Sequence, residues 1–405
     1  MAVSIEEALD RLDRNISPLA SEIIPIELSP GRVAAASYVA TFNLPRFDNS
    51  AMDGYAVMVG DQGKEVRSDK VIYAGDDTYD TLQEGEAIRI MTGAPVPKNC
   101  EAIVPIEEVR IDGALVELPE AIRSGAHVRI AGEDIKKGEC YIEEGERITG
   151  YHTALFASQG VTHISVRRKV RVAVFGTGDE LRPHYEHIEA HQLYNSNAPM
   201  FLARAEELGC NSSYIGGGSD TIQSLKSCIS GALNADLIIT SGGVSVGDKD
   251  FTKEAFTQLG MVTLFSGVSI KPGKPTTVGK IGNTMIVNLP GNPLAAMVNF
   301  EIFVKSIIQK LSGTSARYPG IVESRMGIDF SIKPGRYTVL LGSYDGRTFT
   351  PLPSQSPGMV SPLQEADGMI IVHPDVSLLQ KGKRVSVLPI KWRLEAKKNM
   401  GIFTK

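Results

Sequence analysis

The stretch LIITSGGVSVGDKDF, residues 237–251, decides the fold that the sequence predicts. Its first four residues are an apolar run of strand length, and Gly242, Gly243 and Gly247 then let the backbone turn tightly. A helical pattern that ends at Gly260 follows the loop. A buried strand, a glycine-rich loop and a helix in this order are typical of a parallel sheet covered by helices.

The same unit recurs on both sides of that stretch, over about residues 169–313. The apolar run VRVAVF leads into GTGDEL, and the segment from Asn195 opens a helix that ends at Leu208 and Gly209. Farther along, TMIVNL (284–289) leads into PGNP and a long helix. Ligands of such sheets bind beyond the carboxyl ends of the strands, where all these loops lie.

The flanking regions consist of short β-branched segments separated by glycine and proline. Residues 20–168 predict irregular β structure, and residues from 319 onward predict a small β-barrel or sandwich with a hairpin at Asp345-Gly346. At the N-terminus, Ser4 and Glu7 have the spacing of a capping box, and apolar residues on one helical face follow. We expect this short helix to pack on another part of the chain.

The composition is that of a globular protein, with 405 residues of which 42% are hydrophobic and 22% are charged. The formal net charge of −5 argues against a nucleic-acid-binding protein, because no basic excess is present to neutralise phosphates. The four cysteines fit neither a zinc site nor a disulfide framework, and no signal peptide is recognisable. The most apolar helical segment, residues 294–311, is interrupted by Glu301, Lys305 and Lys310. We therefore expect a cytoplasmic protein without a membrane-spanning helix.

The loop that begins at Ser241 predicts an anion site, because the N–H groups of a glycine-rich turn and a helix N-terminus attract negative charge. Asp248 and Asp250 add carboxylates, and an anion beside carboxylates suggests a bridging magnesium ion. Glu180 follows the first strand of the sheet and would lie at the same edge as Asp250. A plain glycine-rich turn is the alternative, and for Asp220 an ordinary helix N-cap is the preferred interpretation.

Two further loops carry residues suited to a ligand. KPGKP holds Lys271 and Lys274 on a backbone restricted by two prolines, where they can bind an oxyanion as point charges. A solvated, charged turn is the alternative. LPGNP (289–293) is a strand-to-helix turn in which Pro293 suits the first helical position and Asn292 suits the cap. Contact with a substrate is a second interpretation of that turn.

In the first half of the chain, FDNSAMDGYAV (47–57) and RIMTGAPVP (89–97) concentrate polar residues on loops, where functional residues often lie. Ordinary polar turns give the same pattern. His184, His187 and His191 have helical spacing, but no cysteine or carboxylate completes a zinc pattern. A surface excursion is the preferred interpretation of these histidines.

Together these segments resemble the MoeA family, which is related to the C-terminal part of gephyrin and to the molybdenum-insertase domain of plants. The matching segments, in the order of the family, are FDNSAMDGYAV, RIMTGAPVP, AGEDI, GTGDEL, YNSN, SGGVSVGD, KPGKP and LPGNP. They span residues 47–293. Each segment is weak evidence alone, and the ordered set excludes a chance match.

The resemblance implies a homodimer of L-shaped subunits and a multidomain fold of α/β and β parts. These parts are a central α/β domain with a parallel sheet that binds molybdopterin, irregular β domains and a C-terminal β-barrel. The implied divisions are residues 1–20 with 169–318 for the α/β domain, 21–39 with 139–168 for a β linker domain, 40–138 for a β-rich domain that reaches the partner's active site, and 319–405 for the barrel.

The resemblance also implies the reaction of a molybdopterin molybdenumtransferase. Molybdate is inserted into adenylylated molybdopterin, molybdenum cofactor forms, and AMP is released with the help of Mg²⁺. The implied partners are a molybdopterin adenylyltransferase and the apoproteins of molybdoenzymes.

Residues at the matching motifs take implied roles. The metal side of the site would be held by Glu180, Asp220 and Asp250, and molybdate by Lys271 and Lys274. The second subunit would supply Asp53, Thr92, Arg129 and Asp134 to the catalytic site. Further substrate contacts would come from Ser241, Gly242, Gly243, Ser245, Asp248, Pro290 and Ser356.

The chain departs from the family at two points. Where the family often has a basic run before GEDI, only Arg129 remains. In the C-terminal region the family places an Arg on a strand and a Ser in a loop near molybdate. Ser356 or Ser361 can supply the Ser, but the strand reads GRYTVLLG and Arg336 does not align with the family's Arg. The C-terminal contribution to the molybdate site is therefore open.

Two other kinds of function compete with this one. A molybdopterin adenylyltransferase of the MogA type and a CinA-like nucleotide hydrolase share the central fold, but they lack the segment DNSAMDGYAV. A gephyrin-like scaffold would be non-catalytic, and no long linker or appended domain suggests one here. Neither the choice between molybdate and tungstate nor the role of the three histidines follows from the sequence.

Overall fold

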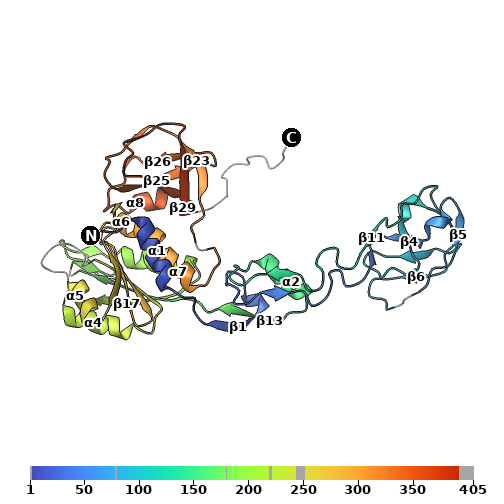
Figure 1. The fold of residues 1–405 in the computed structure, drawn as a ribbon, viewed down its shortest axis with the longest axis horizontal. Coiled ribbons are helices and arrows are strands. Elements are labelled where there is room, and N and C mark those ends of the chain that lie inside the picture. The colour runs from blue at the N-terminus through green and yellow to red at the C-terminus, as the bar shows by residue number, and fades with distance from the viewer. Residues whose placement is uncertain are drawn as a thin grey trace.

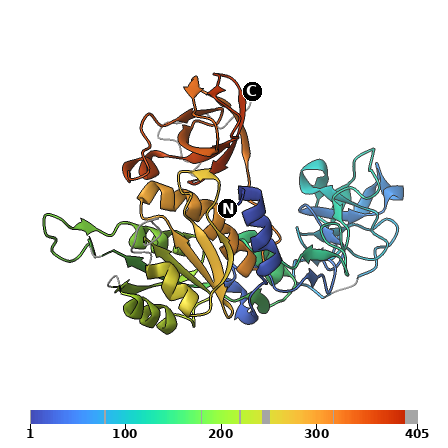
Figure 2. The same cartoon turned by 60° about the vertical axis from the view of Figure 1, so that its left-hand side comes forward.

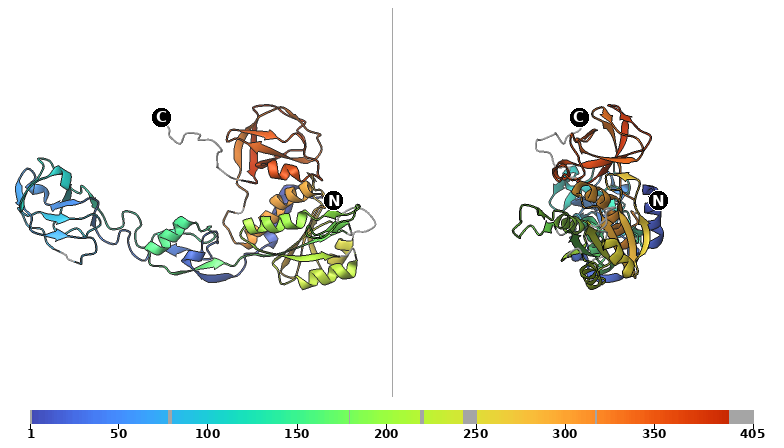
Figure 3. Two further views of the ribbon diagram at one scale, coloured as in Figure 1. Left: turned by 180° about the vertical axis from the view of Figure 1, so that it is seen from behind. Right: turned by 90° about the vertical axis from the view of Figure 1, so that its left-hand side faces the viewer.

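A computed structural model describes residues 2–77, 80–178, 180–218, 221–242, 251–316 and 318–391 of the chain. The molecule has a compact body, in which an α/β layer packs against a small β unit, and an arm that ends in a separate lobe (Figure 1). The left view in Figure 3 shows the same separation of body and lobe. The chain runs out along the arm and returns beside itself, because residues 21–25 pair with residues 163–167.

A six-stranded sheet forms the centre of the body, in the order β17-β14-β18-β22-β21-β19. The strands are β14 (Arg171–Thr177), β17 (Asn211–Gly218), β18 (Leu237–Ser241), β19 (Val262–Ser266), β21 (Thr277–Ile281) and β22 (Thr284–Leu289). The first four in the spatial order are parallel, which confirms the predicted sheet. The sheet is nevertheless mixed: β21 turns directly into β22 through Gly282 and Asn283, so β21 runs antiparallel to both of its neighbours, β22 and β19.

Helices cover both faces of this sheet, as its continuous apolar strands predict. They include α1 (Ile5–Asn15), α3 (Asn197–Glu207), α4 (Ile222–Gly231) and α5 (Phe251–Gln258). Val172 and Val174 of β14 share a buried core with α1 and α3. The alternate residues Ala173 and Phe175 face the other side and share a core with α4 and α5.

The long helix after β22 contains a π-helical segment. It consists of α6 (Pro293–Asn299), η4 (Phe300–Val304) and α7 (Lys305–Leu311). Its charged residues are paired within the fold: buried Glu301 accepts a hydrogen bond from Arg204 Nε at 2.5 Å, and Lys310 pairs with Asp13 of α1. Among the described helices, none combines the length and the apolar character that crossing a membrane requires.

The N-terminal helix α1 packs against a strand that comes much later in the sequence. Its inner apolar residues are buried, and Arg11 donates a hydrogen bond to the carbonyl oxygen of Leu264 at 2.7 Å. Ser4 caps the helix by accepting a hydrogen bond from the Glu7 N–H at 3.1 Å. The predicted capping box is only half formed, because the Glu7 carboxylate pairs with Arg11 at 2.5 Å instead.

The arm and the lobe contain short strands in small sheets, which is the irregular β structure that the sequence predicts. The arm holds β1 (Ser21–Pro25), η1 (Ile26–Leu28), β2 (Tyr38–Val39), β12 (Cys140–Ile142), α2 (Gly150–Ser158) and β13 (His163–Arg167). The lobe holds β3 (Asn49–Ser50), β4 (Gly54–Val57), η2 (Val59–Asp61), β5 (Glu65–Arg67), β6 (Val71–Ile72), β7 (Ile88–Ile90), β8 (Ala102–Pro105), η3 (Ile106–Glu108), β9 (Arg110–Asp112), β10 (Leu115–Glu117) and β11 (Val128–Arg129). Two hydrophobic cores of its own stabilise the lobe.

The C-terminal unit is a small closed barrel rather than a sandwich. Its strands are β23 (Val322–Met326), β25 (Tyr337–Tyr344), β26 (Thr348–Pro351), β27 (Gly368–Val372) and β29 (Arg384–Pro389), and the pairing of β25 with β27 closes the ring. The predicted hairpin at Asp345-Gly346 joins β25 to β26, and Asp345 accepts a hydrogen bond from the Thr348 N–H at 2.7 Å. The smaller elements are β20 (Ile270–Lys271), β24 (Phe330–Ser331), α8 (Ser361–Glu365) and β28 (Leu378–Leu379).

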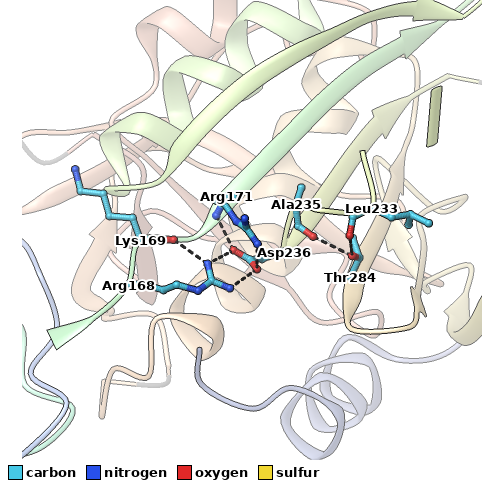
Figure 4. Close-up of polar contacts among 7 residues, drawn as sticks. All are labelled: Arg168, Lys169, Arg171, Leu233, Ala235, Asp236 and Thr284. Carbon is cyan, nitrogen blue, oxygen red and sulfur yellow. Dashed lines mark hydrogen bonds and ion pairs between the residues drawn. The ribbon is translucent and has the colours of Figure 1, made fainter. Parts of the chain in front are cut away.

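The arm joins the central sheet through a buried ion pair at the amino ends of the strands (Figure 4). Arg168 donates two hydrogen bonds of 2.6 Å to Asp236, which also accepts one of 2.8 Å from the Arg171 N–H. Burial alone raises the pKa of Asp236, but these hydrogen bonds outweigh it, so the pKa lies below its ordinary value of 3.8. Beside this pair, the Thr284 hydroxyl lies within hydrogen-bonding distance of the Leu233 and Ala235 carbonyl oxygens.

Candidate active site

A pocket of about 690 Å³ opens at the carboxyl ends of the parallel strands, where a ligand of such a sheet is expected. Its walls come from the ends of β14, β18 and β22, from the start of α3 and from the C-terminal unit. The lining residues are Thr177, Glu180, Leu181, Leu193, Tyr194, Asn195, Ser196, Asn197, Ser241, Gly242, Pro275, Pro290, Gly291, Asn292, Pro293, Gly358 and Val360. Its volume is that of an ordinary small-molecule site.

Ser241 and Gly242 form the floor of this pocket. Gly242 has a φ of +97°, and a Cβ there would lie 2.5 Å from the carbonyl oxygen of Thr177, so only glycine fits. Its N–H donates to the carbonyl oxygen of Leu289 at 3.2 Å and is thus engaged within the fold. The Gly242 N–H is therefore not available to the anion site that the sequence predicts. Gly243, Ser245, Asp248 and Asp250 lie outside the described residues.

Glu180 brings an exposed carboxylate to the lining of the pocket. A Cβ at Gly178, where φ is +140°, would lie 2.7 Å from a Glu180 carboxylate oxygen, so glycine makes room for this side chain. Asp220, like Asp250, lies outside the described residues. The N-cap of α4 is Thr221, not Asp220 as the sequence suggested, and the Thr221 side chain accepts a hydrogen bond from the Ser224 N–H at 3.3 Å.

The loop with Lys271 and Lys274 lies between the sheet and the barrel. Both lysines are exposed, and Pro275, which follows them, lines the pocket. Strand β20 pairs with β25 of the barrel through Lys271 and Thr338, so the barrel helps to fix this loop. Gly273 has a φ of +106°, and a Cβ there would lie 1.7 Å from Asn299 Nδ2. The loop thus lies directly against the end of α6.

The turn after β22 and a segment of the C-terminal unit close the pocket. Pro290 is buried in the lining, and Asn292 occupies the N-cap position of α6 without a side-chain capping hydrogen bond. From the C-terminal unit, the sequence pointed to Ser356, but the lining residues there are Gly358 and Val360. Ser356 donates its N–H toward the sulfur of Met359 at 3.3 Å. The sequence offered no signal for Gly358 or Val360, because glycine and valine carry no recognisable chemistry.

The four remaining predicted site residues belong to the lobe or to its junction with the arm: Asp53 precedes β4, Thr92 follows β7, Arg129 ends β11, and Asp134 follows β11. Strands β4 and β11 lie at the far end of the arm from the central sheet (Figure 1). Asp53 Oδ1 accepts hydrogen bonds of 2.7 Å from both the N–H and the hydroxyl of Thr92. The backbone hydrogen bond and then the hydroxyl hydrogen bond lower the pKa of Asp53. Arg129 and Asp134 line a second pocket of about 540 Å³, between the lobe and α2.

The histidines lie on a loop that projects from the body between β15 (Leu181–Arg182) and β16 (Leu193–Tyr194), seen in green in Figure 2. The ring of His184 contacts that of Tyr185, with a centroid distance of 5.3 Å. In the part of the chain that the structure describes, no three His, Cys, Asp or Glu side chains gather as metal ligands would. The excursion expected from the sequence is thus present, and it carries His184, His187 and His191 as exposed residues.

Asn197 lines the pocket, but no role for it follows from the sequence, although it belongs to the segment YNSN. Its side-chain amide donates hydrogen bonds to Ser241 Oγ at 2.7 Å and to the carbonyl oxygen of Gly291 at 2.8 Å. These partners are 44 and 94 residues away in the sequence. No local pattern could have indicated them.

Three family models match consecutive parts of the chain. They describe the MoeA N-terminal region (domain I and II) over residues 3–160, a probable molybdopterin binding domain over residues 173–310, and the MoeA C-terminal region (domain IV) over residues 323–390. The second of these parts contains most residues of the large pocket.

Relatives match nearly the whole chain. A molybdopterin molybdenumtransferase from Staphylococcus epidermidis is 31% identical over 399 residues, which cover 95% of each chain. One from Bacillus subtilis is 32% identical over 406 residues, which cover 96% of this chain and 94% of the relative. The crystal structure of a molybdopterin biosynthesis MoeA protein from Pyrococcus horikosii superimposes with a TM-score of 0.83 at 30% identity, covering 97% of this chain and 100% of that one.

Proposed function

Because the chain belongs to the MoeA family of molybdopterin molybdenumtransferases, we propose that its large pocket inserts molybdate into adenylylated molybdopterin and releases AMP. The observation that carries this proposal is the position of the pocket. It lies at the carboxyl ends of the strands in the part of the chain that matches a probable molybdopterin binding domain. The chain is thus a transferase of molybdenum cofactor biosynthesis. The two alternative functions, a molybdopterin adenylyltransferase and a non-catalytic scaffold, are not favoured.

In this proposal Glu180, Asp220 and Asp250 hold a magnesium ion. The fit is supported by Glu180, whose carboxylate is exposed in the pocket lining and is a hard oxygen ligand of the kind Mg²⁺ prefers. The ion would neutralise charge on the phosphate link and so improve AMP as a leaving group.

Two groups of residues would bind the substrates. Lys271 and Lys274 would hold molybdate as point charges, which is supported by their exposure beside the pocket residue Pro275. The phosphate and pterin parts would be bound by the loop after β18 and by the turn after β22. The residues proposed there are Ser241, Gly242, Gly243, Ser245, Asp248 and Pro290, and Ser356 of the C-terminal unit is proposed as a further substrate contact.

We propose further that two copies of the chain build each active site. Asp53, Thr92, Arg129 and Asp134 would enter the partner's pocket, which is supported by their place in or next to the lobe, since the lobe stands apart from the body (Figure 3, left). The four divisions of the chain, the location in the cytoplasm, and the adenylyltransferase and molybdoenzyme partners remain parts of the same proposal.

The test is cofactor assembly from purified components. Protein, adenylylated molybdopterin, molybdate and magnesium are mixed, and AMP release and activation of a cofactor-free molybdoenzyme are measured. We expect molybdate-dependent AMP release that falls about 100-fold in Asp250→Asn, because a metal ligand is lost. We also expect a strong loss in Lys274→Ala. Lys333→Ala, which removes an exposed lysine in the C-terminal unit, is the matched control and should keep full activity.

A different result would identify a different enzyme. If the wild-type protein releases no AMP but transfers AMP from ATP to molybdopterin, the chain is an adenylyltransferase and the proposal is wrong. If Asp250→Asn is as active as wild type, the assignment of the metal side is wrong.

A further inference from the structure

Asn197 lies where three segments of the pocket meet. It is the first residue of α3 and only 7% exposed, yet it forms part of the pocket lining. Its Nδ2 donates to Ser241 Oγ, at the end of β18, and to the Gly291 carbonyl oxygen, in the turn after β22. One amide thus ties the start of a helix to two loops that follow parallel strands.

The hydroxyl of Ser241 continues this network. Ser241 Oγ accepts from Asn197 and donates to the carbonyl oxygen of Pro290 at 3.0 Å. The Ser241 hydroxyl proton is therefore engaged within the protein, and this hydrogen bond connects the end of β18 to the turn after β22. The backbone on either side of this connection lines the pocket as Gly242 and Gly291.

The other atom of the amide indicates why an asparagine stands here. Among the residues that the structure describes, buried Asn197 Oδ1 has no hydrogen-bond partner. Buried polar atoms are nearly always paired, so an orphaned acceptor is an unfavourable feature for stability alone. The Asn197 amide instead serves a role that needs two hydrogen-bond donors on one rigid group. These two donors reach both loops.

We propose that Asn197 is a positioning residue of the transfer reaction, which fixes Ser241 and the Pro290-Gly291 turn so that both loops contact the same substrate. This inference rests on the proposed function. Asn197 acts through Ser241, so the two residues should behave as a unit, and loss of either should loosen the same part of the pocket.

The test is a double-mutant cycle with Asn197→Ala, Ser241→Ala and the double variant. The measured quantities are the KM and kcat for adenylylated molybdopterin and the midpoint of thermal unfolding. We expect each single change to raise KM about tenfold, as the loss of a buried hydrogen-bond link does, with a smaller change in kcat. The double variant should be within about twofold of the single variants, because the link is already broken.

Thr284→Ala supplies the matched control. Thr284 lies at the opposite, amino-terminal edge of the same sheet, and its hydroxyl also contacts two backbone carbonyl oxygens (Figure 4). This variant loses comparable hydrogen bonding far from the pocket. It should lower the unfolding temperature but leave KM unchanged.

The outcomes separate the two proposals. KM effects that multiply in the double variant would mean that Asn197 acts independently of Ser241, and a KM for Asn197→Ala no different from that of Thr284→Ala would make its role purely structural. Either result overturns the inference.

If the wild-type protein releases no AMP, the proposed function fails, and calorimetric binding of AMP to the same variants then tests the positioning role. If Asn197→Ala does not fold, the KM of Ser241→Ala is compared with that of Thr284→Ala instead, and equal KM values overturn the inference.

Discussion

At the scale of single residues, the structure distinguishes glycines that share a backbone conformation but not an environment. Gly273 in the lysine loop and Gly335 before β25 have φ values of +106° and +113°. A Cβ at Gly273 would meet Asn299 Nδ2 at 1.7 Å, whereas nothing lies within 4 Å of a Cβ at Gly335. The same substitution at the two positions therefore separates backbone strain from collision.

We predict that Gly273→Ala raises the KM for molybdate about 100-fold, since displacement of catalytic groups by about 1 Å has effects of that size. The loop would move away from Asn299 and carry Lys271 and Lys274 with it. Steady-state assays with varied molybdate measure the effect. Gly335→Ala has the same strain without the collision and should lower stability only. Equal KM values in the two variants would show that the contact with Asn299 does not position the lysines.

The sequence predicted only some of the residues that line the pocket. Ser241, Gly242 and Pro290 stand out because each follows an apolar strand in an unusual loop, and all three line the pocket. Asn197 has no such signal, because its role depends on partners brought together by the sheet. For the same reason the sequence did not show that the Gly242 N–H is already engaged by Leu289.

At the scale of elements, the root of the arm is stabilised by one buried ion pair. The Asp236 side chain is 8% exposed and that of Arg168 is 29% exposed. We predict that Asp236→Asn lowers the free energy of unfolding near neutral pH by about 3 kcal/mol, because Arg168 loses its charged partner. Urea denaturation measures this loss, and Asp10→Asn, which breaks the exposed pair with Arg14 on α1, should have little effect.

The same pair predicts a pH dependence. Because the pKa of Asp236 is lowered in the folded state, its contribution is fully present above the ordinary value of 3.8 and is lost as the pH falls through the folded value. The difference in unfolding free energy between wild type and Asp236→Asn should thus stay constant from neutral pH down to about pH 4 and shrink below it. A difference that instead grows at acid pH would contradict the lowered pKa.

Helices and strands were predicted well from the sequence where their pattern is local. The direction and pairing of strands were predicted poorly. The apolar runs of β14, β18 and β22 and the helices between them follow from periodicity. The antiparallel direction of β21 does not, because an apolar run carries no information about the direction of its strand. The π-helical segment η4 also lacks a sequence signal, and the pairing of its buried Glu301 with Arg204, 97 residues away, has none either, in contrast to the local pairing of Glu301 with Lys305.

At the scale of the whole molecule, the candidate residues are divided between two distant places. Periodicity cannot show this, because the arm is formed by residues 21–25 pairing with residues 163–167. The family resemblance supplied the expected arrangement, in which a second copy completes each site. The separation of the lobe from the body in Figures 1 and 3 makes that expectation testable.

We predict that two inactive variants restore activity when mixed. Asp53→Asn damages the lobe and Glu180→Gln damages the pocket, so a mixed dimer has one site with both residues intact. After random exchange of subunits, about a quarter of the sites should be functional. AMP release before and after exchange measures the recovery. A mixture of Glu180→Gln with Lys271→Ala, both in the pocket, is the control and should stay inactive. No recovery in the first mixture would mean that each site comes from one chain.

The docking of α1 on β19 has a consequence for synthesis on the ribosome. Arg11 and its partner Leu264 are 253 residues apart. At roughly 5–20 residues per second, translation makes the partner on the order of 10–50 s after the helix has been made. Until then a helix of 11 residues is marginal in water, so the first segment to emerge stays unfolded. The body of the protein closes only late in translation, well after the lobe has been completed.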